Sequence, residues 1–227
     1  SHDRAHVRQL AVGALPHRSG QHVAELTAFC RSLSLPPGFG HCGVEANEAL
    51  AVLARPAAPY KAARVFWSGA SETVPANSCH LAVQLEGGWS LLELSRDCHG
   101  NGRYYRRLIV ETLELKDIVP GGALELVLRY HLSASEPVQH EGGNSVLESE
   151  TRSSLAVCGV TEGGALSCVG PLEIGVSYSD DQGRQDRYRL DVVVRDGKLE
   201  AKVKPGSSSR LPAELAALLG IHPLRFQ

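Results

Sequence analysis

The strongest constraint on the fold is a period-two alternation of apolar and polar residues that runs from Lys61 to Lys204. Successive side chains of a β-strand point to opposite faces, so this alternation is typical of strands with one buried face. In the segment ALELVLRYHL, four leucines and a tyrosine share one face, while Glu125, Arg129 and His131 share the other. The sequence therefore predicts a mainly β protein with about nine strands.

Short glycine-rich turns separate these strands. Asp196-Gly197 is a strong signal for a two-residue hairpin turn, and further turns are expected at Asp180–Gly183 and Val119–Gly122. No helical segment between the strands is long enough to serve as a parallel crossover. The expected architecture is an antiparallel β-sandwich or a strongly curved sheet.

Three segments are expected along the chain. Residues 1–59 read as a helix-loop segment packed on the core, because apolar residues recur there at helical spacing before Pro36-Pro37-Gly38. Residues 60–205 form the antiparallel β domain. Residues 206–227 combine a flexible linker with a short helix that caps the sheet and has Pro212 near its start.

The six cysteines fall into three local couples, which favour structural disulfides. A three-residue loop at Glu162–Gly164 would place Cys158 directly opposite Cys168. A two-residue turn at Gly87-Gly88 leaves Cys79 one diagonal step from Cys98, so that bridge requires a bulge or a longer turn. The predicted disulfide residues are Cys30, Cys42, Cys79, Cys98, Cys158 and Cys168.

Two Cys-His dipeptides, Cys79-His80 and Cys98-His99, raise the alternative of a metal site. Neighbouring side chains in a strand point to opposite faces, so one dipeptide does not supply two ligands to one ion without a bulge. The spacing also matches no zinc-finger or zinc-ribbon pattern. We therefore expect no metal and no other cofactor, with free thiols as a further alternative to disulfides.

Disulfides at hairpins favour the periplasm, the cell surface or the exterior, because cytosolic thiols stay reduced. A formal net charge of -2 argues against nucleic-acid binding, and no apolar run is long enough for a spanning helix. The chain begins at Ser1 and contains no methionine, which predicts a processed or truncated product, and a removed leader could have carried a lipid anchor. The excess of arginine over lysine is typical of a GC-rich bacterial genome.

Two segments are candidate binding surfaces. RYYRR combines cations with aromatic rings that could stack on sugars or contact an acidic partner, although a solvated strand explains the same pattern. The segment Ser135–Glu150 reads as a long polar loop, and loops of that length are functional or disordered. The candidate binding residues are Arg103, Tyr104, Tyr105, Arg106, His140, Glu141 and Asn144.

The sequence contains no nucleophile elbow, phosphate-binding loop or dinucleotide fingerprint. It therefore predicts a non-enzymatic binding module, or a subunit of a bacterial envelope or surface assembly, whose partner is another surface protein or a carbohydrate. The alternative is a secreted hydrolase in which carboxylates converge only in the folded chain. The acids considered for that role are Asp97, Glu111, Glu125 and Asp191.

Overall fold

The structure is a computed structural model that describes residues 12–14, 41–42, 50–69, 78–95, 98–100, 105–139, 145–183, 185–208 and 210–226. It is mainly β, with two antiparallel sheets and very little helix, as the alternation predicts. The expected helix in the first 59 residues falls outside the described residues.

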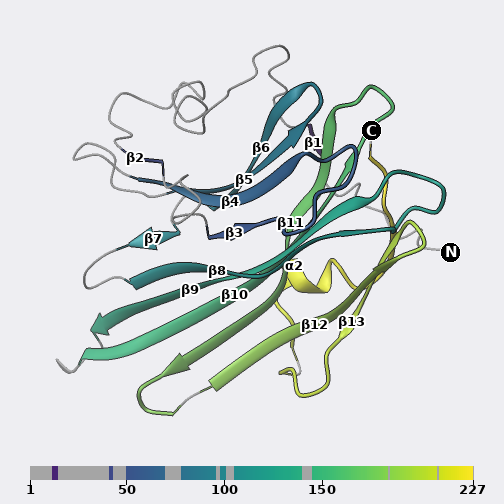
Figure 1. The fold of residues 1–227 in the computed structure, drawn as a ribbon. Coiled ribbons are helices and arrows are strands. Elements are labelled where there is room, and N and C mark those ends of the chain that lie inside the picture. Colours follow the sequence, from purple (N-terminus) through teal and green to yellow (C-terminus); the bar gives the residue numbers. More distant parts are fainter. Residues whose placement is uncertain are drawn as a thin grey trace, which may run out of the picture.

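The smaller sheet has five strands, in the order β2-β4-β5-β6 with β3 paired to β4. Its members are β2 (His41–Cys42), β3 (Ala51–Val52), β4 (Ala62–Gly69), β5 (Ser78–Leu85) and β6 (Gly88–Ser95). Figure 1 shows this sheet in blue above the larger one.

The larger sheet has nine strands, in the order β14-β13-β12-β11-β10-β9-β8-β7 with β1 paired to β11. Its members are β1 (Val12–Ala14), β7 (His99–Gly100), β8 (Tyr105–Lys116), β9 (Glu125–Gln139), β10 (Ser145–Val160), β11 (Leu166–Asp180), β12 (Gln185–Arg195), β13 (Lys198–Val203) and β14 (Gly220–Pro223). Ten strands, β4 to β13, lie within residues 60–205, close to the number expected.

One buried core is shared by the two sheets. Leu81 and Val83 of the smaller sheet pack in the same cluster as Leu126 and Leu128 of the larger sheet. Tyr130 reinforces this contact, because its hydroxyl donates to the carbonyl of Leu94 at 3.1 Å. Burial raises the pKa of that phenol to about 12.

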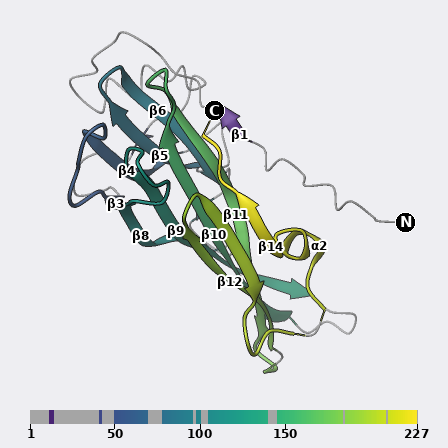
Figure 2. The same ribbon diagram turned by 90° about the vertical axis from the view of Figure 1, so that its right-hand side faces the viewer.

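A second core lies between strands β9 to β13 and the C-terminal helix α2 (Ala213–Ala216). Leu215 and Leu218 are buried there against Val192 and Leu199. The short helix is therefore present where the sequence predicts one, but it is only four residues long. Strand β14 follows it, as Figure 2 shows, and was missed because its four residues, from Gly220 to Pro223, contain both a glycine and a proline.

Both local cysteine couples in the described β region form disulfides. Cys158 faces Cys168 in register across the hairpin of β10 and β11, with Cα atoms 4.0 Å apart. Cys79 bonds to Cys98 with Cα atoms 5.8 Å apart. The predicted bond between Cys30 and Cys42 stays a prediction, because Cys30 and the side chain of Cys42 lie outside the described residues.

The turn expected at Gly87-Gly88 is wrong by one residue. Leu85 pairs with Gly88, so Glu86 and Gly87 form the turn. Cys98 then lies beyond the end of β6 rather than opposite Cys79, and its carbonyl accepts a hydrogen bond from the amide of Leu108 on β8. The disulfide therefore connects β5 of the smaller sheet to the segment that enters the larger sheet, instead of closing a single hairpin.

Candidate functional site

The sequence prediction of a polar loop over Ser135–Glu150 is wrong. Strand β9 continues to Gln139 and β10 begins at Ser145, so every described residue of the segment, eleven of the sixteen, is strand. We call the outer part of five strands the blade; it comprises residues 105–107, 133–139, 145–151, 177–180 and 185–187. In the blade every side chain that the structure describes is half-buried or exposed, so its polarity reflects two solvated faces rather than a loop.

Of the predicted binding residues, only Arg106 has a described side chain. It lies on β8 and is half-buried. Tyr105 begins the same strand, with only its backbone described. The other five residues fall outside the description, so the RYYRR hypothesis stays a prediction for them: Arg103, Tyr104, His140, Glu141 and Asn144.

Strand register brings Arg106 into a row that crosses the blade. Arg106 pairs with Ala134, Ala134 with Glu150, Glu150 with Tyr178, and Tyr178 with Asp186. Residues directly opposite each other in antiparallel strands point to the same side of the sheet. Five strands therefore contribute one side chain each to a single line.

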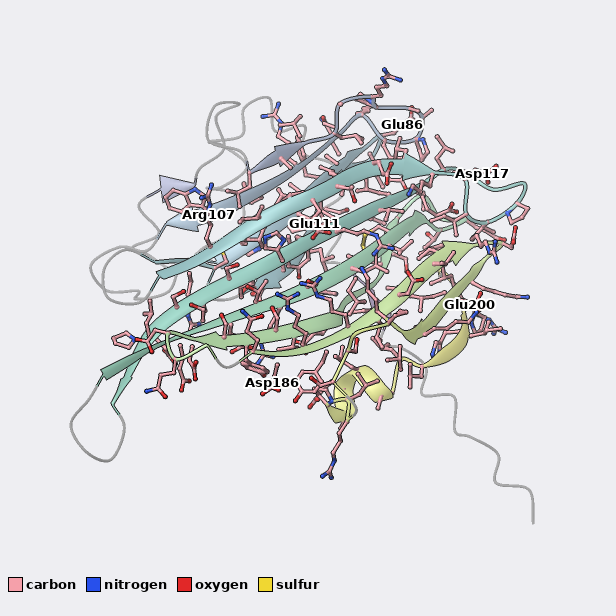
Figure 3. All side chains as sticks on the ribbon, turned by 90° about the horizontal axis from the view of Figure 1, so that it is seen from below. Glu86, Arg107, Glu111, Asp117, Asp186 and Glu200 are labelled. Carbon is pink, nitrogen blue, oxygen red and sulfur yellow. A yellow bond between two sulfur atoms is a disulfide. The ribbon has the colours of Figure 1, made fainter. Side chains whose placement is uncertain are left out.

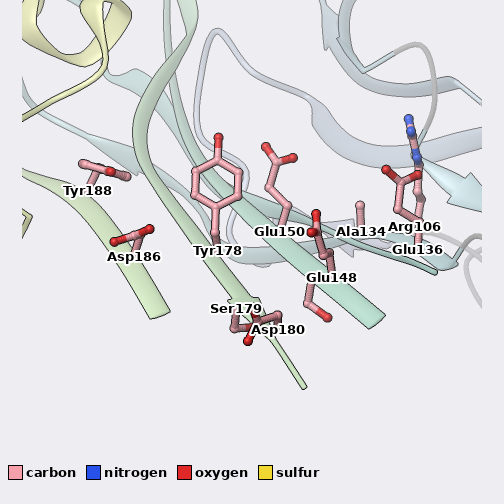
Figure 4. Close-up of a pocket in the computed structure, with 11 residues that line it drawn as sticks. Arg106, Ala134, Glu136, Glu148, Glu150, Tyr178, Ser179, Asp180, Asp186 and Tyr188 are labelled. Carbon is pink, nitrogen blue, oxygen red and sulfur yellow. The ribbon is translucent and has the colours of Figure 1, made fainter. Parts of the chain in front are cut away.

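A second row lies next to the first, nearer the ends of the strands. Glu136 pairs with Glu148, and Glu148 with Asp180. We call the side of the blade that carries these two rows the acidic face. Figure 4 shows Glu148, Glu150 and Tyr178 there.

The acidic face is hollowed into an open groove of about 420 Å³. Tyr188 adds a second aromatic ring, set edge-on to Tyr178 with centroids 6.5 Å apart. The groove is lined by Arg106, Ala134, Glu136, Glu148, Ser149, Glu150, Tyr178, Ser179, Asp180, Asp186 and Tyr188. Its lining thus carries five carboxylates and one guanidinium group, so its potential is negative.

One further arginine anchors the acids at the inner end of the groove. The Arg152 guanidinium contacts the Glu150 carboxylate and forms a 3.0 Å ion pair with Glu173. Burial raises the pKa of the Tyr178 phenol, and the negative charge of Glu150 raises it further. Tyr178 therefore presents a neutral phenol and an aromatic ring to the groove at physiological pH.

The acids considered for a hydrolase do not meet as a pair in the part of the chain that the structure describes. Buried Glu125 accepts the amide hydrogens of Ile118 and Val119 and so closes a turn. Glu111 lies five residues from the partner of Glu125 along β8, about 17 Å away, and contacts His131. Exposed Asp191 pairs with Lys202 in another strand pair, and Asp97 is not described.

Among the described residues no three Asp, Glu, His or Cys side chains are grouped so that they could hold a metal ion. The acids of the groove are spread over four strands, β9 to β12. This arrangement is suited to an extended ligand with several positive groups.

No protein-family model matches the sequence, and comparisons with curated proteins and with solved structures found no significant similarity. In the described part of the chain, no helix is long and apolar enough to cross a membrane. Of the groove lining, the sequence predictions named Arg106 as a binding residue and included four more residues in the candidate segment Ser135–Glu150: Glu136, Glu148, Ser149 and Glu150. They did not include the lining residues of β11 and β12.

Proposed function

We propose that this protein is a disulfide-stabilised, extracytoplasmic binding module or assembly subunit without enzymatic activity. Its acidic groove is the contact surface for its partner. The two sheets with their shared core form a β-sandwich, and the blade extends the larger sheet beyond it. The observation that carries this proposal is the groove, in which five strands align charged and aromatic side chains on one solvated face.

The extracytoplasmic location is supported by the two disulfides. Structural disulfides persist in oxidising compartments and are rare in the cytosol. Cys79, Cys98, Cys158 and Cys168 are each almost fully buried, so these bonds are shielded from reductants. A stabilised scaffold of this kind suits a bacterial envelope or a cell surface.

The partner's chemistry follows from the groove's charge. Five carboxylates and one arginine attract a cationic group, and an extended groove accommodates several such groups in line. The exposed ring of Tyr178 adds a face for a cation–π contact with lysine or arginine. The fitting partner is a basic segment of another surface protein. Tyrosine rings also stack on sugars, so a carbohydrate is the competing ligand.

The test is a binding titration by isothermal calorimetry and nuclear magnetic resonance. A tetralysine peptide and neutral maltotetraose serve as the two probes. We expect the peptide to bind and to shift the resonances of groove residues, with affinity that falls as salt rises. Preferential binding of maltotetraose would assign the groove to carbohydrate, and binding of neither probe would contradict the proposal.

A matched pair of variants separates the groove from the overall charge. Glu136→Gln with Glu148→Gln removes two carboxylates from the groove and should weaken peptide binding about tenfold. Glu86→Gln with Glu162→Gln removes the same charge from two exposed turns and should change it little. Equal losses in both variants would show that the peptide recognises only net charge.

A further inference from the structure

The face of the blade opposite the groove has a different composition. Along each strand, the residues that alternate with those of the acidic face point to this opposite side and form rows of hydroxyl groups. The side-chain oxygens of Ser133 and Thr151 lie 3.2 Å apart, and those of Ser135 and Ser149 lie 2.9 Å apart. The strand register gives three neighbouring rows, each with one residue from β8, β9, β10, β11 and β12: Tyr105–Ser135–Ser149–Ser179–Gln185, Arg107–Ser133–Thr151–Ser177–Arg187 and Ile109–His131–Ser153–Gly175–Arg189. The third of these rows lies just beyond the inner edge of the blade. We call the side that carries all three rows the arginine face.

The arginine face is positively charged. Its three rows hold Arg107, Arg187 and Arg189, all exposed, together with His131, and they contain no carboxylate. Glu111, near its inner edge, contacts the His131 ring at 3.3 Å. Figure 3 shows Arg107 and Glu111 on strand β8, in a view from below the larger sheet.

The two faces carry opposite charges, and they are also similar in size. Arg107 and Arg187 lie at the two ends of a five-strand row, about 19 Å apart across the sheet. On the acidic face, carboxylates extend over four strands from Glu136 to Asp186, or about 14 Å. Flexible arginine side chains readily bridge the difference of a few ångströms.

We propose that copies of this protein associate head to tail, with the arginine face of one blade on the acidic groove of the next. This inference rests on the groove being a contact surface, as proposed above, and identifies the partner as a second copy of the chain. Because the two complementary faces lie back to back on the same strands, each copy can bind one neighbour on either side. Such a heterologous contact does not close on itself and builds a row of subunits.

The area of the two faces determines how strongly one copy is expected to bind the next. Five strands and three rows cover roughly 20 by 15 Å, or about 300 to 400 Å² for each partner. Specific stable interfaces bury about 800 Å² for each partner, so a single contact should be weak. Association should therefore be visible only at high protein concentration and low salt, unless many copies are held together.

The experiment is sedimentation equilibrium over a wide concentration range at about 0.02 M and about 0.5 M salt. The weight-average mass should rise with concentration at low salt and fall toward the monomer at high salt. A protein that stays monomeric at millimolar concentration in low salt would overturn the proposal. So would an association that salt does not weaken.

Charge-reversed variants test which faces meet. Glu136→Lys with Glu148→Lys reverses part of the acidic face, and Arg107→Glu with Arg187→Glu reverses the arginine face. Each variant alone should associate at least about tenfold more weakly, because the two lysines leave three carboxylates against three cations in the groove, whereas the two glutamates make the arginine face acidic. An equimolar mixture of the two should associate, since the unaltered arginine face of one variant meets the unaltered groove of the other.

Recovery of association in the mixture is a result that a folding defect in either variant cannot explain. Association that is unchanged by these reversals would overturn the proposal, as would a monomer whose arginine face binds a sulfated polysaccharide. The Arg107→Glu, Arg187→Glu variant keeps the groove lining intact. If it binds tetralysine while the wild-type protein stays monomeric, only the self-association fails; if neither variant nor wild type binds tetralysine, the proposed function fails.

Discussion

Cys79 and Cys98 are bonded across a boundary between sheets, with Cα atoms 5.8 Å apart. Cys79 lies in β5 of the smaller sheet, whereas Cys98 lies directly before β7, which belongs to the larger sheet. Both residues are buried in the shared core. The disulfide therefore fixes the point at which the chain passes from one sheet to the other.

Replacing both of these cysteines with serine should lower the free energy of unfolding by about 3 kcal/mol, because a crosslink of this loop length reduces the entropy of the unfolded chain. Urea unfolding followed by circular dichroism measures the change. The Cys158→Ser, Cys168→Ser variant is the comparison, since its loop is shorter and lies within one hairpin. A cost well below about 1 kcal/mol for the first variant would show that packing alone holds the crossover.

His80 should make the protein less stable in mildly acidic solution. It lies on β5, stacked on Phe66 with ring centroids 5.4 Å apart. Burial lowers the pKa of its imidazole, and the nearby charge of Glu93 opposes that effect in part. A lowered pKa means that the unfolded chain takes up the proton first. The stabilising effect of neutral His80 is therefore complete above its unfolded pKa of about 6.5 and is lost as pH falls below it.

The measurement is the free energy of unfolding of the wild type and of His80→Gln at several pH values. The difference between them should be constant above about pH 7 and should shift in favour of the variant below about pH 6.5. The other histidines affect both proteins alike and cancel in the difference. A shift toward the wild type at low pH would mean that the attraction of Glu93 outweighs burial.

Gly159 is required by the position of Phe226. A Cβ atom built on Gly159 would lie 2.6 Å from two atoms of the Phe226 ring, which packs on β10 near the C-terminus. Gly159→Ala should cost about 1 to 3 kcal/mol, because the ring must move out of its contact. In a Phe226→Ala background the same substitution should cost much less. Gly163→Ala is the control, since its Cβ would meet no atom closer than 3.7 Å.

Local pairings were predictable from the sequence because turn chemistry determines them. The register that places Cys158 opposite Cys168 follows from the loop at Glu162–Gly164. The bond between Cys79 and Cys98 was predictable, but the position of Cys98 beyond the end of β6 was not. A one-residue shift of the β5–β6 turn moves Cys98 out of the hairpin, and that shift depends on which residues of β6 pack in the core.

The part of the blade from Ser135 to Glu150 was not predicted as strand because it lacks the signal that identifies strands. A strand with one buried face alternates apolar and polar residues, whereas ten of the sixteen residues from Ser135 to Glu150 are polar and the others do not alternate with them. The groove escaped for a different reason. Its acids are contributed by four strands, from Glu136 on β9 to Asp186 on β12, and only sheet order and register bring them together.

Arg152 should restrain the affinity of the groove for cations. Its guanidinium pairs with Glu150 and Glu173, and its side chain is 48% exposed. Removing one positive charge about 6 Å from a bound cation relieves a repulsion of about 0.7 kcal/mol in water, or roughly threefold in affinity. Arg152→Gln should therefore bind tetralysine about threefold more tightly. Its stability should change by less than about 0.5 kcal/mol, because exposed ion pairs contribute little.

Arg210→Gln, which removes the same charge from the exposed segment before α2, is the matched control and should leave the affinity nearly unchanged. Calorimetric titration at two salt concentrations measures both variants. Weaker binding by Arg152→Gln would mean that Arg152 matters chiefly by holding the Glu150 carboxylate in place. That result would make Glu150 the group that receives the cation, and Glu150→Gln should then reproduce the loss.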